Sequence, residues 1–259
     1  MKAWRLSLAA ALLIAATLPA LAGRTCEAKA PTAISVQRAM ELAERTAQAL
    51  DASGAEVVVI GRAGQDLSRW QLRWSHLGLA YRDGSVWRVV HKLNHCGTAQ
   101  ADLYRQGLAE FFLDDPFEYR AAISVLTPEL QARLRPLLPD NAWIARLHQP
   151  AYNMLAYPWS QTYQQSNQWL IEALAMAQEP RADTRERAQA WLKVQAYEPT
   201  TLRIGTMERL GARISAANLS FDDHPNDKRF GGRIETVTAD SVFAWLERSR
   251  LGERMREWR

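Results

Sequence analysis

Residues 75–91 read SHLGLAYRDGSVWRVVH, in which two runs of alternating apolar residues flank an Asp-Gly pair. Asp-Gly between such runs is the strongest short-range signal for a two-residue type I′ hairpin turn. With Asp83 and Gly84 as the loop, Arg82 faces Ser85. The sequence therefore predicts a β-hairpin, and the turn fixes the register of its two strands.

The predicted register places His76 directly opposite His91 on one face of the hairpin. The Cβ atoms of such a pair are roughly 4.5–5.5 Å apart. Imidazole can transfer protons near neutral pH, so the pair is a candidate catalytic constellation. The alternative interpretation is two partly exposed histidines on an edge hairpin. The same face is expected to carry Gly78, Ala80, Trp87 and Val89.

Residues 1–22 have the three parts of a secretory signal peptide. Lys2 and Arg5 form its basic start, and residues 6–18 form an apolar run that is too short to span a bilayer. The small-x-small sequence Ala-Leu-Ala at the end is typical of a cleavage site. We expect this segment to be removed and the chain to be periplasmic or secreted. The weaker alternative is an uncleaved membrane anchor.

The charge of the chain gives little indication of a nucleic-acid partner. The formal net charge is +4, and two of the positive charges lie in the predicted signal peptide. The arginines that follow are scattered, whereas nucleic-acid-binding proteins gather basic residues on one face. No later segment is long and apolar enough to cross a membrane. Because the chain is expected to be exported, we expect its substrate or ligand to belong to the cell envelope. We expect no cofactor.

The chain has two cysteines, Cys26 and Cys96. In an oxidising compartment an even pair usually forms a disulfide. Such a bond would join the start of the exported chain to the end of the hairpin. The competing interpretation makes Cys96, which lies between His95 and Gly97, a reactive thiol.

The rest of the sequence alternates between helical and extended patterns. Helical periodicity is found at residues 34–52, 100–113, 128 onward, 163–178, 183–195 and 206–216, and in a last helix through residue 245 that Asp240 caps. Strand-like runs lie at residues 55–61, 119–126, 218–221 and 233–238. Strands clustered between groups of helices predict a single α+β domain over residues 23–259, with a small antiparallel sheet flanked by helices.

A hydrolase would need a nucleophile near the two histidines, preferably at a helix N-terminus, where backbone N–H groups stabilise negative charge. Ser166 is the best candidate because it opens the helix predicted over residues 163–178. A serine in that position is also an ordinary helix cap, and this structural role is the more common one.

Residues 75–79, SHLGL, resemble the (S/T)H-x-G-(I/L) strand of the circularly permuted papain-like, NlpC/P60-type hydrolase superfamily. The segment QSNQWL at residues 165–170 is similar to the nucleophile motif Asn-Cys-x-x-Phe-(V/L) of that superfamily. The resemblance implies a permuted papain-like fold, with His76 as the base, His91 as the residue that orients it, and Ser166 as the nucleophile. These motifs are short, and the matching covers about a third of the chain.

The chain departs from that pattern at the nucleophile, where Ser166 stands in place of cysteine. Cysteine ionises readily, whereas serine needs a general base to remove its proton. The chain also resembles, over its whole length, a group of secreted bacterial proteins with a domain of unknown function. The segments that carry this likeness are RAGQDLS at 62–68, SH-x-G at 75–78, YQQSNQW at 163–169 and FDDHP at 221–225.

Two further clusters contain candidate site residues. Asp223 and His224 could join a cleft or bind a metal with the other histidines, but FDDHPND is also a favourable turn sequence. No tight metal-ligand spacing such as HExxH is present. Gln65 and Asp66 precede the hairpin and are candidates for orienting groups in the cleft, with an ordinary surface loop as the alternative.

From these residues we predict an amide or ester hydrolase in which Ser166 attacks, His76 accepts the proton and His91 orients His76. A cell-wall peptide and an acylated lipid are both compatible substrates. The main alternative is a catalytically inactive cleft that binds an envelope ligand or protein. A metal site built from the histidines and Asp223 is a third possibility.

Overall fold

The computed structural model describes residues 30–113, 116–215 and 217–259. Its strands are β1 Val57–Ala63, β2 His76–Asp83, β3 Val86–Asn94, β4 Ala101–Gly107, β5 Glu118–Val125, β6 Thr200–Arg203, β7 Arg233–Thr236 and β8 Arg256–Trp258. Its helices are α1 Ala33–Ser53, α2 Leu108–Leu113, α3 Pro128–Leu134, α4 Asn141–Ala145, α5 Ser166–Gln178, α6 Arg185–Val194, α7 Thr206–Ser215, α8 Asn226–Phe230 and α9 Ala239–Arg248, with a short 3₁₀ helix, η1, at Ser68–Trp70.

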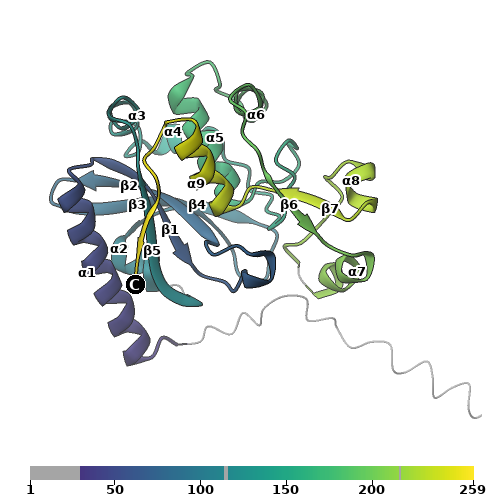
Figure 1. Ribbon diagram of the computed structural model, residues 1–259, viewed down its shortest axis with the longest axis horizontal. Helices are drawn as coiled ribbons and strands as arrows, with labels where there is room; N and C mark the ends of the chain where they lie inside the picture. The colour runs from purple at the N-terminus through teal and green to yellow at the C-terminus, as the bar shows by residue number, and fades with distance from the viewer. Residues whose placement is uncertain (1–29, 114–115, 216) are drawn as a thin grey trace, which may run out of the picture.

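Six strands form one antiparallel sheet in the order β4-β3-β2-β1-β5-β8, and β6 and β7 pair separately (Figure 1). Every residue of β1 is buried, because this central strand is covered on both faces. Helices flank the sheet, so the predicted α+β class with an antiparallel sheet is confirmed.

The two faces of the sheet are covered by different helices. On one face α1 and α2 pack against alternate residues of the strands, including Ile60, Ala80 and Val89. On the other face α5 packs against the residues that alternate with them, including Leu77 and Leu79. Because successive side chains of a strand point to opposite faces, a residue's position in its strand decides which group of helices it meets.

Helix α5 is the buried helix of the fold. Each residue from Ser166 to Ala177 is buried, because the sheet lies on one side of the helix and α3, α6 and α9 contact it elsewhere. A helix that is covered on all sides needs few charged residues, and α5 carries one, Glu172. Its N-terminus lies at the end of the sheet where β2 begins.

The hairpin of β2 and β3 forms, but its loop is Gly84-Ser85 and not Asp83-Gly84. Asp83 pairs with Val86, and the strands pair from there in regular register. Gly84 has a φ of 62° and Ser85 has no positive φ, which fits a type II′ turn rather than the predicted type I′ turn.

The corrected register moves the partner of each β2 residue by two positions along β3. Continued along the strands, it places Gly78 opposite His91, so the prediction that His76 lies directly opposite His91 is wrong. A shift of two residues leaves every side chain on its predicted face, whereas a shift of one would have reversed it. His76 and His91 are therefore diagonal neighbours on the α1–α2 face.

Three predicted elements are wrong. Residues 101–107 form the edge strand β4 and not the first half of a helix, because pairing with β3 overrides their helical pattern. Residues 218–221 are not a strand. The last helix is capped by Thr238, whose side chain accepts a hydrogen bond from the Ser241 N–H, and Asp240 lies within its first turn.

Some sequence predictions fall on residues outside the described part of the chain. These are the signal peptide at residues 1–22 and Cys26. Cys96 is disulfide-bonded, and its pairing with Cys26 stays a prediction. Within the described ranges, no helix combines the length and hydrophobicity that a membrane span requires.

Gly78 allows the close approach of β2 and β3 beside the histidines. A Cβ atom at this position would collide with Val89 Cγ1 and lie 3.4 Å from His91 Cβ. We therefore expect Gly78→Ala to lower the free energy of unfolding by about 1–3 kcal/mol, as overpacking usually does. Urea unfolding of the two proteins measures the change.

Gly107→Ala is the matched control for Gly78→Ala, because a Cβ atom there would have no neighbour within 4 Å. Gly107 also lies in a strand of the same sheet. Its replacement is expected to change the stability by less than about 0.5 kcal/mol, as surface substitutions generally do. Equal losses for the two variants would contradict a specific steric role for Gly78.

Candidate functional site

His76 and His91 are joined by a side-chain hydrogen bond. His76 Nε2 lies 2.8 Å from His91 Nδ1, and the ring centroids are 5.1 Å apart in an edge-to-face arrangement. His91 is fully buried, and 8% of His76 is exposed. The two histidines that the sequence brings to one face are therefore in direct contact, with only His76 accessible.

A chain of hydrogen bonds continues from His91 to the surface of the protein. His91 Nε2 lies 2.7 Å from Gln106 Oε1, and Gln106 Nε2 donates to Glu110 Oε1 at 3.0 Å. Gln106 belongs to β4 and Glu110 to α2, both on the α1–α2 side of the sheet. Sequence analysis missed both residues, because the strand that carries Gln106 was predicted to be helical.

This chain fixes the tautomers of both histidines. The Glu110 carboxylate only accepts, so the Gln106 amide nitrogen faces it and the amide oxygen faces His91. His91 therefore donates from Nε2, and in its neutral form it accepts at Nδ1 from His76 Nε2–H. The lone pair of His76 is then on Nδ1, which leaves this nitrogen as the available base.

The surroundings of His76 favour its neutral form. Burial, the positive charge of Arg62 and the neighbouring His91 together hold the pKa of His76 well below its usual value of 6.5. Phe111 packs beside both imidazole rings, and the Arg62 guanidinium lies over the Phe111 ring and donates to the Phe111 carbonyl. His76 is therefore unprotonated at neutral pH.

Ser166 is the first residue of α5 but does not cap it. The side chain of Gln165 accepts the hydrogen bond from the Asn167 N–H, so the cap is Gln165. Burial raises the pKa of Tyr152, and a side-chain hydrogen bond with Ser166 opposes this increase. The Ser166 hydroxyl therefore interacts with the Tyr152 hydroxyl.

Asn167 ties this end of α5 to the start of β2. Its Oδ1 accepts from the Leu77 N–H at 3.0 Å, and its Nδ2 donates to the Ser75 carbonyl at 3.4 Å. Ser75 and Leu77 are the residues immediately before and after His76 in the chain. Asn167 thus fixes the position of Ser166 relative to His76, a role that the sequence pattern did not reveal.

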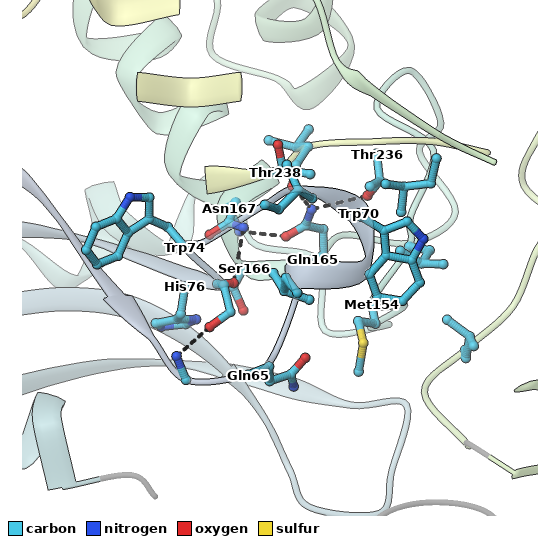
Figure 2. Close-up of a pocket in the computed structure, with 18 of the residues that line it drawn as sticks. Gln65, Trp70, Trp74, His76, Met154, Gln165, Ser166, Asn167, Thr236 and Thr238 are labelled. Carbon is cyan, nitrogen blue, oxygen red and sulfur yellow. Dashed lines mark hydrogen bonds between the residues drawn. The ribbon is translucent and has the colours of Figure 1, made fainter. Parts of the chain in front are cut away.

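His76 and Ser166 line the same cavity, which has a volume of about 470 Å³. The cavity lies where β1 and β3 end and β2 begins, and its opposite wall comes from β6, β7 and neighbouring loops. Figure 2 shows the His76 and Ser166 side chains among those that line it, with Trp70 and Met154 around another part of the cavity.

His76 and Ser166 approach this cavity from different layers. His76 points toward the α1–α2 face, whereas α5 covers the other face. Among the described residues, no hydrogen bond joins the two side chains. Rotation about χ1 gives the Ser166 hydroxyl three staggered positions.

Of the two residues before the hairpin, Gln65 is the more closely associated with the site. Both Gln65 and Asp66 line the cavity, and Figure 2 shows the Gln65 side chain among those that line it. Asp66 is exposed and accepts hydrogen bonds from the Ser68 hydroxyl and N–H, which lower its pKa. Asp66 therefore shapes the loop that borders the cavity.

Asp223 and His224 form a buried pair that is not part of the cavity wall. His224 Nδ1 lies 3.0 Å from Asp223 Oδ1, and His224 Nε2 lies 2.9 Å from the Glu235 carbonyl. Asp223 also accepts from the Tyr157 N–H at 2.8 Å. These contacts join three segments of the chain. The described residues contain no cluster of three or more potential metal ligands.

A second buried polar network supports α5 from the other side. Lys92 of β3 donates to the Gln149 carbonyl and, at 2.8 Å, to Gln164 Oε1. Gln164 Nε2 donates to Glu172 at 2.6 Å, and Arg185 forms an ion pair with Glu172 at 2.9 Å. Burial, with a smaller contribution from Arg185, lowers the pKa of Lys92 to about 7. The network fixes Gln164, two residues before Ser166.

The family described as "Uncharacterized protein conserved in bacteria (DUF2145)" matches residues 49–246. The chain belongs to this family. The DUF2145 region includes the whole six-stranded sheet except β8, the helix α5, and the residues that line the cavity. No curated protein and no solved structure matches the chain.

Proposed function

We propose that this DUF2145 protein is a hydrolase of ester or amide bonds. Ser166 Oγ attacks the carbonyl carbon of the substrate, and His76 Nδ1 accepts the hydroxyl proton. The proton then passes to the departing alcohol or amine, and water releases the acyl group from Ser166. The observation that carries the proposal is the His76–His91–Gln106–Glu110 chain, which ends at the cavity that Ser166 lines.

The direction of the hydrogen bonds suits a general base at His76. Each side chain donates to the next one toward Glu110, so the positive charge that develops on His76 is stabilised along the chain. His91 holds the His76 ring in one orientation and one tautomer, as the third member of a catalytic triad does. Gln106 and Glu110 are positioning residues in this scheme.

The position of Ser166 suits a nucleophile. The N-terminus of α5 carries the positive end of the helix dipole, which favours the negative charge that forms on the attacked carbonyl oxygen. Asn167 and the Lys92–Gln164–Glu172 network hold this end of the helix against the sheet. Fixed geometry of this kind lowers the cost of bringing the reacting groups together.

The permuted papain-like architecture is part of the same proposal. The order of elements supports it, because the histidine strand comes first, a second polar residue follows on the next strand, and the candidate nucleophile opens a helix that packs on the sheet. We also propose, from the sequence, that the chain is exported and that its substrate belongs to the cell envelope.

A binding protein without catalytic activity is the second candidate. The interaction of Ser166 with Tyr152 favours it, because the hydroxyl that would have to reach His76 interacts with the tyrosine. The same cavity would then bind an envelope ligand without chemical change.

Ester hydrolysis distinguishes the two candidates. We expect the protein to release p-nitrophenol from p-nitrophenyl butyrate, and Ser166→Ala to reduce this rate to that of buffer. Ser35→Ala on α1, on the other side of the sheet, should leave the rate unchanged. A wild-type rate that Ser166→Ala does not reduce would exclude Ser166 as the nucleophile.

The low pKa of His76 predicts the pH dependence of this reaction. The base must be neutral, and a pKa well below 6.5 keeps it neutral as the pH falls through 6.5. The rate should therefore stay constant from pH 8 to below 6.5 and decline only at lower pH. Stopped assays over this range measure the midpoint.

Arg62→Met tests the contribution of the Arg62 charge, which acts in addition to burial, to this low midpoint. Removal of the positive charge beside His76 should move the decline to higher pH, toward 6.5. A wild-type midpoint at or above 6.5 would show that another group, or a solvated histidine, controls the reaction.

A further inference from the structure

The part of the cavity away from His76 and Ser166 has mainly apolar walls. The side chains that form it come from η1, the loop before α5 and the β6 region, and include Trp70, Leu72, Met154, Leu155, Leu202 and Phe221. Leu202 and Phe221 also belong to a small hydrophobic cluster with Ile204 and Ile234. A volume of about 470 Å³ lies within the range of small-molecule sites, roughly 300–1,000 Å³.

The charged side chains in the cavity wall already interact with protein groups. Asp66 accepts two hydrogen bonds from Ser68, and Arg62 donates to the Phe111 carbonyl. Arg69 and Glu208 form an ion pair with each other. Against the apolar walls, a charged group would lose its hydration without compensation, which is costly. The apolar part of the cavity therefore favours an uncharged group.

We propose that the cavity binds the apolar acyl group of a neutral ester or amide. The carbonyl would lie at the polar end beside Ser166 and His76, and the hydrocarbon would extend along the wall formed by Trp70, Met154 and Leu155. The identity of the reacting end depends on the proposed function. The preference for an uncharged, apolar ligand does not, because it rests on the walls alone.

This preference distinguishes an acylated lipid from a cell-wall peptide. Cell-wall peptides carry carboxylates and amines, which would lose their hydration against these apolar walls. An acyl chain needs only apolar contact, and each buried methylene contributes about 0.8 kcal/mol. Of the two substrates compatible with the sequence, the walls favour the acylated one.

Binding to Ser166→Ala tests the proposal without requiring catalysis. The neutral fluorophore N-phenyl-1-naphthylamine is expected to bind with enhanced emission, and methyl octanoate is expected to displace it. Octanoate, which has the same chain and a negative charge, should displace it at least about tenfold less well, and an alanyl-glutamate dipeptide should not displace it. Displacement by the dipeptide, or no binding of the fluorophore, would overturn the proposal.

Two variants locate the binding to these walls. Leu155→Glu places a charge in the apolar wall, and Met154→Trp fills space without a charge, so both should weaken fluorophore binding at least about tenfold. Leu210→Glu is the control, because Leu210 of α7 is exposed and does not line the cavity. Undiminished binding in both wall variants, with their folds verified by circular dichroism, would place the ligand elsewhere and refute the proposal.

The activity of the wild-type protein separates this inference from the proposed function. A hydrolase whose kcat/KM for p-nitrophenyl octanoate does not exceed that for p-nitrophenyl acetate would refute the acyl site and retain Ser166 as the nucleophile. Fluorophore binding by a protein that hydrolyses neither ester would retain the apolar site and refute the hydrolase.

Discussion

Replacement of Glu172 by leucine is expected to lower the free energy of unfolding by about 3–5 kcal/mol, the cost of leaving a buried charge without its partner. Glu172 is fully buried and accepts hydrogen bonds from Arg185, Gln164 and Gln189. Without it, the Arg185 guanidinium stays buried without its carboxylate partner. Urea unfolding of the wild type and the variant measures the loss.

Glu198→Gln is the matched control for Glu172→Leu. Glu198 also pairs with an arginine, Arg248, but the pair is exposed and its closest atoms are 3.8 Å apart. Exposed pairs contribute about 0–1 kcal/mol. If the two variants lost equal stability, the network beneath α5 would not have the structural role assigned to it.

The double variant Glu172→Leu/Arg185→Leu separates the ion pair from the packing around it. The double variant removes the guanidinium that Glu172→Leu leaves unpaired, so the combined loss should be smaller than the sum of the single losses. Additive losses would indicate that Arg185 acts through its hydrogen bonds to the carbonyls of Ser160, Gln161 and Tyr163, and not through Glu172.

Replacement of His76 by alanine is expected to slow phosphonylation of Ser166 by a fluorophosphonate about 10²–10⁴-fold, the usual contribution of a general base. His91→Ala should slow it less, because His91 orients the base and does not accept the proton from serine. His95→Ala is the control, since His95 is exposed and pairs with Asp102 outside the cavity. Rate constants come from intact-protein mass spectrometry over time.

A His76→Ala variant that reacts as fast as the wild type would contradict the role of His76 as the base. Loss of reactivity in His95→Ala would show that the reaction depends on a residue outside the cavity, and would contradict the proposed location of the active site. Gln106→Leu gives a further comparison, because it removes the acceptor of His91 Nε2 and should slow the reaction while leaving Ser166 accessible.

The sequence predicted the shared face of the two histidines even though it placed the hairpin loop one residue too early. The face to which a strand side chain points depends only on whether its position in the strand is odd or even. The error shifted the strand pairing by two residues, which leaves every side chain on its predicted face. The class of the fold and the start of α5 at Ser166 were also predictable from local sequence. The spacing of apolar residues indicates helices and strands, and turn-forming residues indicate where they end.

The rest of the site depends on contacts that no local pattern specifies. Gln106 reaches His91 only because residues 101–107 pair with β3 as an edge strand, although their composition favours a helix. Tyr152 reaches Ser166 from a loop. Asp223 and His224 were candidates because of their chemistry, but tertiary packing uses them to join segments behind the cavity wall.

Peptide mass spectrometry after fluorophosphonate treatment tests the central claim most directly. The mechanism predicts a phosphonyl group on the wild-type peptide that contains Ser166, and no modified serine in the Ser166→Ala protein. A folded wild-type protein in which Ser166 stays unmodified, or in which another serine carries the group, would contradict it.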